Sequence, residues 1–238
     1  MALERQSPCK VNLLLNILGK RPDGFHELET VMHPVRFFDE MRFERGGRHI
    51  RIACNLPTLP VDAQNLVYRA ARAFRRAANV ADGVRIRLIK RIPLAAGRGE
   101  QIRTLGFFPA LRGKAFLLIH PGFGIATAWA YQRLAGFPSA LNGRPGRAAE
   151  LVAALQAQNW PAVAGGFYNS LEAPALDKFP ILALFQEFLR TNGALATLMS
   201  GSGSTTFAIV ENVAAGGTLV EKFKERFGRN CWTAVVGI

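Results

Sequence analysis

Two segments of this chain alternate apolar and polar residues, and this alternation limits the fold more than any other sequence feature. Between residues 48 and 54, Ile50, Ile52 and Cys54 alternate with more polar or smaller residues, and between 84 and 88 the aliphatic residues alternate with Arg85 and Arg87. A period of two places the two sets of side chains on opposite faces of a strand. The first third of the chain therefore predicts half-buried strands of a mainly antiparallel sheet, with arginines on the solvent face.

The remaining patterns predict an α+β fold. Further strands are predicted at residues 11–18, 31–38, 41–43, 114–119, 205–210 and 232–236, and helices at 65–79, 127–135, 148–158, 180–191 and 218–227. The helix at 65–79 has an apolar stripe and takes Asp62 or Asn65 as its cap; the stripe consists of Leu66, Val67, Ala70, Ala71, Phe74 and Ala78. A turn at 109–113 separates a β-rich first part from an α+β second part and predicts domains at 1–112 and 113–238.

Length and composition exclude several protein classes. The 238 residues contain no apolar run of the roughly 18 residues that cross a bilayer, and the charged N-terminus does not resemble a secretory signal. The three cysteines are odd in number and widely spaced, which argues against a disulfide framework and a zinc site. We therefore expect a cytoplasmic protein without a membrane partner or a bound structural metal.

The charge is strongly basic. Thirty Lys and Arg residues against seventeen Asp and Glu give a net charge of +13, which attracts polyanions. The arginines are dispersed and poorly interleaved with aromatic residues, so that solvated faces explain them equally well and no specific nucleic-acid partner is expected.

The first motif that carries chemistry lies near the N-terminus. Lys10 and Asn12 are two residues apart on a predicted strand, so their side chains project to the same side and can meet one ligand. After the turn at 21–24, Phe25 offers a ring for stacking and His26 an imidazole with a donor and an acceptor nitrogen. Taken alone, an exposed lysine and a packed Phe-His pair are the commoner explanations.

Two glycine-containing segments are candidates for anion binding. The segment 199–205 reads Met-Ser-Gly-Ser-Gly-Ser-Thr, in which Gly201 and Gly203 flank Ser202 and let the backbone N–H groups approach an anion. The segment 92–100 follows Pro93 with Gly97 and Gly99 on either side of an arginine. The second segment is the weaker candidate, and an ordinary loop also explains it.

Together these motifs resemble the GHMP kinase superfamily, and more narrowly its 4-diphosphocytidyl-2-C-methyl-D-erythritol kinase family. The resemblance rests on Ser-Pro-x-Lys-Val-Asn-Leu at 7–13, Pro-Asp-Gly-Phe-His at 22–26 and the Gly-Ser segment, and it runs almost end to end. It implies a two-domain GHMP-kinase-like enzyme, monomeric or homodimeric, that uses ATP and Mg²⁺ to phosphorylate a hydroxyl of a cytidine diphosphate substrate in isoprenoid precursor synthesis.

The same resemblance implies roles for individual residues. Lys10 would be the catalytic lysine, Asn12 would bond the substrate's polyol, Phe25 and His26 would hold the cytosine, and Thr127 would border the substrate. The positions that would border ATP and its phosphates are Asn65, Pro93, Gly97, Gly201, Ser202 and Gly203. Phe25 stands where the family more usually has Tyr.

One departure from the family pattern is large. After Gly97 the family continues into a long glycine-rich ATP loop, a helix and a segment with the catalytic aspartate, whereas this chain passes directly to Arg98-Gly99-Glu100. Several dozen residues are absent, so the N-terminal domain is truncated internally. None of the five aspartates stands in the missing context; they are Asp23, Asp39, Asp62, Asp82 and Asp177.

This loss removes much of what a kinase contributes, since phosphoryl transfer depends on positioning and electrostatic stabilisation at the phosphates. We expect little or no kinase turnover. Two alternatives stay open: a non-catalytic protein that retains the cytidine pocket, and a basic module that binds nucleic acid with a steep salt dependence.

Overall fold

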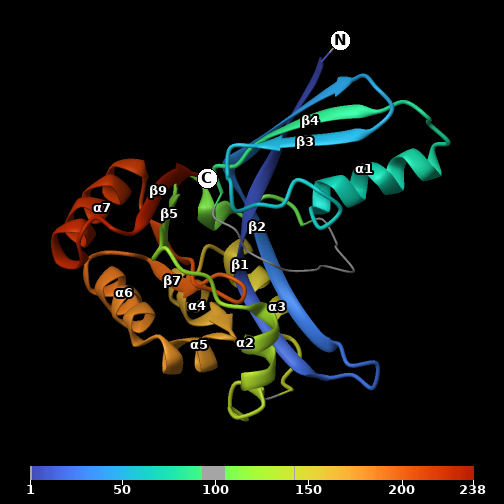
Figure 1. The fold of residues 1–238 in the computed structure, drawn as a ribbon. Coiled ribbons are helices and arrows are strands. Elements are labelled where there is room, and N and C mark those ends of the chain that lie inside the picture. The colour runs from blue at the N-terminus through green and yellow to red at the C-terminus, as the bar shows by residue number, and fades with distance from the viewer. Residues whose placement is uncertain (1, 93–104, 142) are drawn as a thin grey trace. The chain divides into compact units, whose positions relative to one another are not determined.

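The computed structural model describes residues 2–92, 105–141 and 143–238. The chain divides into two compact units, one made of Met1–Cys9 and Phe37–Pro93 and the other of Lys10–Arg36 and Leu94–Ile238. Two long strands, β1 (Ala2–Lys20) and β2 (His26–Arg45), contribute residues to both units (Figure 1). The predicted domain boundary between residues 112 and 113 stays a prediction.

The first unit contains β3, β4, parts of β1 and β2, and one helix. Strand β4 (Val84–Ile89) lies between β2 and β3 (Ile50–Cys54) and pairs antiparallel with β2 but parallel with β3. Helix α1 (Leu66–Ala77) connects β3 to β4, because two parallel neighbours cannot be joined by a tight hairpin turn. The two alternating segments are strands as predicted, and the parallel pairing of β3 corrects the expectation of a mainly antiparallel arrangement at this edge.

Helix α1 begins where its sequence indicates. Asn65 is the N-cap, and its side-chain oxygen accepts a hydrogen bond from the backbone N–H of Val67. The predicted apolar stripe is divided by the structure: Val67 packs against the core of Ile50, Ile86 and Leu88, whereas other members face solvent. Leu66 is 75% exposed and Phe74 is 68% exposed, so this unit leaves part of the stripe uncovered.

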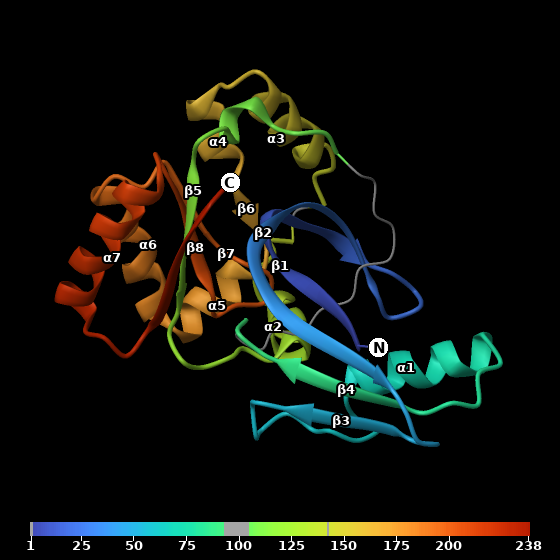
Figure 2. The same cartoon turned by 90° about the horizontal axis from the view of Figure 1, so that it is seen from above.

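The second unit contains a four-stranded antiparallel sheet in the order β7-β8-β5-β9. Its strands are β5 (Ala115–His120), β7 (Ala196–Met199), β8 (Thr206–Val210) and β9 (Trp232–Gly237). Helices α6 (Pro180–Thr191) and α7 (Val213–Phe227) lie side by side against this sheet (Figures 1 and 2). Buried Leu117, Phe185 and Phe223 belong to the core between them, and this core supports the strands that carry the candidate site.

Shorter elements complete the second unit. They are a 3₁₀ turn (Pro109–Leu111), α2 (Thr127–Leu134), α3 (Arg147–Gln156), α4 (Trp160–Gly166), β6 (Tyr168–Asn169) and α5 (Glu172–Lys178). Strand β6 pairs parallel with β1 at Leu14 and Leu15. Strands β6 and β7 and helices α4 and α5 were not predicted from the sequence. In the described ranges no helix combines the length and the apolar character needed to cross a membrane.

Helix α7 begins earlier than the sequence predicts. Asn212 caps it and accepts a hydrogen bond from the N–H of Ala215, so that Gly216 and Gly217 fall inside the helix. A Cβ atom at Gly216 would lie 2.6 Å from a methyl carbon of Val235. The glycine that hides the helix start in the sequence is therefore what allows the helix to approach the sheet.

The exposed part of the α1 stripe generates a test. Replacing Leu66 and Phe74 together by Gln should change the free energy of unfolding by no more than about 0.5 kcal/mol and lower self-association, because neither side chain is buried. The matched control Val67→Gln, which places an amide against the core, should cost about 1–3 kcal/mol. Urea denaturation and light scattering measure both effects; an equal loss of stability in the two variants would contradict this packing.

Candidate active site

Lys10 and Asn12 meet on one face of β1, as their spacing predicts. The Lys10 Nζ donates a hydrogen bond to Asn12 Oδ1 at 2.8 Å. Lys10 is exposed, whereas the Asn12 side chain is buried with 4% of its surface exposed. The amide oxygen therefore holds the ammonium group at a defined position on the surface.

The Asn12 amide is itself fixed in orientation. Its Nδ2 donates to Thr30 Oγ1 at 3.0 Å, and Thr30 Oγ1 donates to the carbonyl of Leu14 at 2.7 Å. Because the threonine hydroxyl uses its proton on that carbonyl, it accepts from the Asn12 amide, which places the amide oxygen toward Lys10. The neighbouring strand β2 thus determines which group Lys10 meets.

The Gly-Ser loop of residues 200–204 lies beside this pair. The backbone N–H of Asn12 donates to Ser200 Oγ at 3.2 Å, joining positions 188 residues apart. A Cβ built on Gly201 would lie 3.7 Å from Asn12 Oδ1. The structure therefore brings together the two motifs on which the sequence reading depended.

The loop is a closed turn with little room for side chains. The N–H of Ser200 donates to the carbonyl of Thr205, and the N–H of Gly203 donates to the carbonyl of Ser200. Gly203 has φ +88°, and a Cβ there would lie 2.5 Å from Met199 Sδ. A side chain at position 203 would therefore clash with Met199. The positive φ there already disfavours any residue with a Cβ atom.

The loop presents donors suited to an anion. Ser202 Oγ lies 3.0 Å from Thr127 Oγ1 at the start of α2, and Ser202 is buried. In the described part of the chain, the N–H groups of Gly201 and Ser202 have no hydrogen-bond acceptor. Two unused N–H groups beside hydroxyls form a small anion-binding concavity.

Two residues that sequence reasoning did not assign to the site hold the loop in place. Asn169 is buried, and its Nδ2 donates to the carbonyls of Met199 and Gly201 at 2.7 and 2.8 Å. Glu172 accepts a hydrogen bond from the N–H of Met199 at 2.7 Å, and burial raises the pKa of its carboxyl. Both residues stand in the Asn-Ser-Leu-Glu run at 169–172.

Phe25 and His26 follow the hairpin turn between β1 and β2. Phe25 is 52% exposed, and the His26 ring lies 4.7 Å from the Tyr131 ring of α2. Burial lowers the pKa of His26 below its ordinary 6.5, and nearby Lys20 lowers it further. The imidazole is therefore neutral at pH 7 and offers one donor and one acceptor.

The residues expected to border ATP, unlike those expected to bind the substrate, do not all belong to the second unit. Asn65 belongs to the first unit, where Nδ2 donates to the carbonyl of Pro60 and Oδ1 caps α1, so its amide is already engaged. Pro93 and Gly97 lie outside the described residues. Over the described ranges no group of three or more His, Cys, Asp or Glu side chains could hold a metal ion.

Three of the five aspartates already have basic partners. Asp23 pairs with Arg21, Asp82 pairs with Arg45, and Asp39 pairs with a lysine of the first unit. Asp39 also accepts hydrogen bonds from two backbone N–H groups, those of residues 91 and 92. These carboxylates serve local structure in the places where they lie.

The comparisons with known proteins agree with the geometry. Residues 140–229 match the family described as GHMP kinases C terminal. The 4-diphosphocytidyl-2-C-methyl-D-erythritol kinase of Syntrophus aciditrophicus (strain SB) is 33% identical, covering 87% of this chain and 89% of that protein. The kinase of the same name from Synechococcus sp. (strain JA-3-3Ab) is 31% identical, covering 86% and 84%.

A third relative indicates the size of the missing segment. The kinase of the same name from Pelotomaculum thermopropionicum is 30% identical over 276 aligned positions that cover 94% of each chain. Since 94% of 238 residues is about 224, roughly 50 of those positions have no residue in this chain. The relatives therefore contain several dozen residues that this chain lacks.

Solved structures show the same fold. A crystal structure of 4-(cytidine 5'-diphospho)-2C-methyl-D-erythritol kinase is 26% identical with a TM-score of 0.73, covering 99% of this chain and 100% of that one. The homoserine kinase of Cytophaga hutchinsonii is 17% identical with a TM-score of 0.71, covering 98% and 93%. The predicted α+β fold of the GHMP kinases is thus confirmed.

The crowding at Gly203 can be tested against a matched glycine. Gly193 also has a positive φ, +99°, but no atom lies within 4 Å of a Cβ built there. Gly193→Ala should cost about 1–2 kcal/mol from its backbone conformation alone, and Gly203→Ala about 1–3 kcal/mol more because it also overpacks the loop. Chemical denaturation measures both; equal losses would contradict the close approach to Met199.

Three half-buried histidines predict a loss of stability in acid. Burial lowers the pKa of His26, His33 and His120 below 6.5. The stability they contribute is present above pH 6.5 and is lost as the pH falls, because the unfolded chain takes up the protons first. Glu172, whose pKa is raised, has the opposite effect.

The midpoint of thermal unfolding should therefore fall between about pH 7.5 and about pH 5.5. In a variant with all three histidines replaced by Gln, that fall should shrink. An undiminished fall in the triple variant would assign the acid sensitivity to other groups.

Proposed function

Because the chain belongs to the 4-diphosphocytidyl-2-C-methyl-D-erythritol kinase family, we propose that it derives from an ATP-dependent kinase for that substrate. We further propose that it retains the substrate-binding residues and is impaired in phosphoryl transfer. The observation that carries the proposal is the hydrogen-bonded arrangement of Lys10, Asn12 and the Gly-Ser loop within one unit.

Lys10 and Asn12 would act on the methylerythritol part of the substrate. The Lys10 ammonium places a positive charge where an attacking hydroxyl develops negative charge, which favours its deprotonated form. The Asn12 amide orients Lys10 and would bond a polyol hydroxyl. In this role Lys10 is the catalytic residue and Asn12 both positions it and binds substrate.

The remaining residues would bind the cytidine diphosphate part. The exposed Phe25 ring offers a face for stacking on cytosine, and neutral His26 offers hydrogen bonds to the edge of the base. Thr127, whose hydroxyl lies 3.0 Å from that of Ser202, would border the substrate. Their common presence in the second unit supports the retention of substrate binding.

The site for ATP is incomplete by the same reasoning. ATP supplies the phosphoryl group, and Mg²⁺ accompanies it, held mainly by phosphates and one or two carboxylates. Among the residues assigned to ATP, Asn65 offers no unused amide atom, and about 50 positions of the relatives are absent. Residues of this chain that remain for ATP are the loop members Gly201, Ser202 and Gly203.

Turnover and binding should therefore be separable. With ATP, Mg²⁺ and 4-diphosphocytidyl-2-C-methyl-D-erythritol, coupled ADP release should be at least about 10²-fold slower than that of the Pelotomaculum relative, since general-base assistance alone is worth about 10²–10⁴-fold. Titration calorimetry with the same substrate should still give a binding heat. His26→Ala should abolish or strongly weaken that heat, whereas Phe107→Ala, an exposed aromatic residue outside the site, should not.

The impaired phosphoryl transfer and the retained substrate binding can be refuted separately. Turnover equal to that of the relative, lost on Lys10→Ala, would refute the impairment. Absence of a binding heat, or a heat unchanged in His26→Ala, would refute the retained cytidine pocket and with it the alternative of a non-catalytic cytidine-binding protein.

A further inference from the structure

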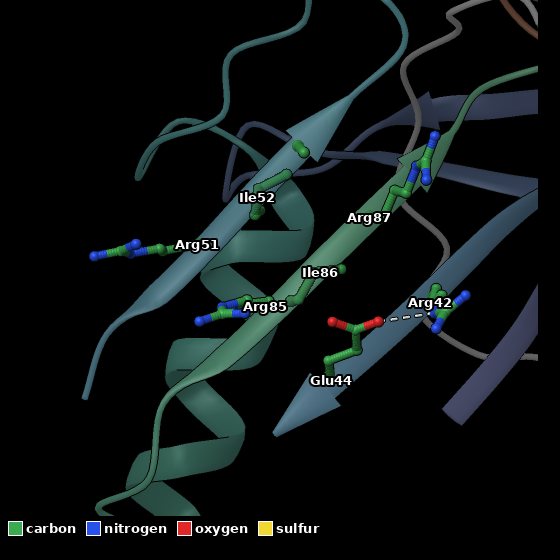
Figure 3. Close-up of a pocket in the computed structure, with 8 residues that line it drawn as sticks. Arg42, Glu44, Arg51, Ile52, Arg85, Ile86 and Arg87 are labelled. Carbon is green, nitrogen blue, oxygen red and sulfur yellow. Dashed lines mark ion pairs between the residues drawn. The ribbon is translucent and has the colours of Figure 1, made fainter. Parts of the chain in front are cut away.

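One face of the first unit's sheet carries a group of arginines that the kinase function does not use. On the sheet face that points away from α1, strands β2, β3 and β4 carry Arg42, Arg51, Arg85 and Arg87 (Figure 3). They line a hollow of about 470 Å³ together with Glu44. The alternate side chains of the same strands form the core under α1, so the arginines are held on a supported surface.

The strand register places these charges close together. Arg87 is opposite Arg42 on β2, and Arg85 lies between Arg51 on β3 and Glu44 on β2. Neighbouring strands are about 4.8 Å apart, and residues two apart along a strand about 7 Å. Like charges directly opposite one another destabilise a sheet. An anion that neutralises these charges therefore stabilises the sheet.

In the described part of this unit, two carboxylates offset part of the charge, and both pair with Arg42: Glu4 of β1 lies 3.8 Å from its guanidinium group. Glu44 pairs with Arg42 at 2.9 Å, as the dashed line in Figure 3 shows. In the described part of the chain, Arg51, Arg85 and Arg87 have no carboxylate oxygen within 4.0 Å. These three guanidinium groups are exposed and available to a ligand.

The positive charge of the chain is also concentrated in this unit. Its ranges, Met1–Cys9 and Phe37–Pro93, contain 13 Lys or Arg against 6 Asp or Glu, a net charge of +7 in 66 residues. The other unit's 172 residues have 17 against 11, a net charge of +6. A local excess of this kind attracts polyanions to this face.

We propose that this face binds the phosphodiester backbone of single-stranded nucleic acid without reading its sequence. Three adjacent strands span about 10 Å, less than the roughly 12 Å width of a duplex major groove, so the patch meets one backbone. The residues that line it include no aromatic ring, so bases have no platform for stacking. Arg51, Arg85 and Arg87 supply the contacts.

The salt dependence of binding tests this directly. For a labelled oligouridylate of about 20 nucleotides, three phosphate contacts predict a slope of about −2 in a plot of log K against log salt. Arg51→Ala, Arg85→Ala and Arg87→Ala combined should reduce the slope toward zero and weaken binding about tenfold or more at low salt. The control variant replaces Arg69, Arg72 and Arg76, three exposed arginines of α1, and should retain most of the binding.

Both triple variants lose the same net charge, so only the position of the arginines differs between them. Circular dichroism and an Arg-to-Lys version of the sheet variant, which should bind with most of the original salt slope, control for folding. Equal losses in the two Ala variants, or no binding by the intact chain at low salt, would overturn the proposal. A deoxythymidylate of the same length should bind similarly; strong preference for one sugar would contradict recognition through phosphates alone.

Discussion

The contact between β1 and the Gly-Ser loop is the constraint on which the candidate site depends. The N–H of Asn12 donates to Ser200 Oγ, while Asn169 binds the carbonyls of Met199 and Gly201 from the other side. These hydrogen bonds support a loop conformation in which its unused N–H groups lie beside the Asn12 amide. Without this anchoring, Lys10 would still meet the Asn12 amide, but the loop would not be held beside the pair.

The missing segment affects the residues assigned to ATP more than the residues assigned to the cytidine diphosphate substrate. The residues assigned to the cytidine diphosphate substrate belong to the unit formed by Lys10–Arg36 and Leu94–Ile238, whose core is continuous around β5, α6 and α7. The residues assigned to ATP are divided between the units or fall outside the described ranges. A chain of this family can thus keep the surface for one substrate while losing much of the surface for the other.

Local patterns predicted most of the elements but not how they pack. The alternation at 84–88 and the Pro180 start of α6 are intrinsic to the sequence, and both elements were found as predicted. β7 was missed because its four residues, Ala-Thr-Leu-Met, are all buried and show no alternation of exposed and buried positions. The exposure of Phe74 and the role of Asn169 depend on distant contacts, which a single sequence does not contain.

The central claim is that this chain keeps the residues that bind the substrate but has lost the segment that binds the phosphates of ATP. The most direct measurement inserts, between Gly97 and Arg98, the corresponding segment of roughly 50 residues from the Pelotomaculum relative and compares steady-state turnover before and after. We predict that the chain with the insertion turns over at least about 10²-fold faster, because the inserted segment restores general-base assistance. Its affinity for the substrate should be nearly unchanged. A folded inserted chain with no gain in turnover would contradict it.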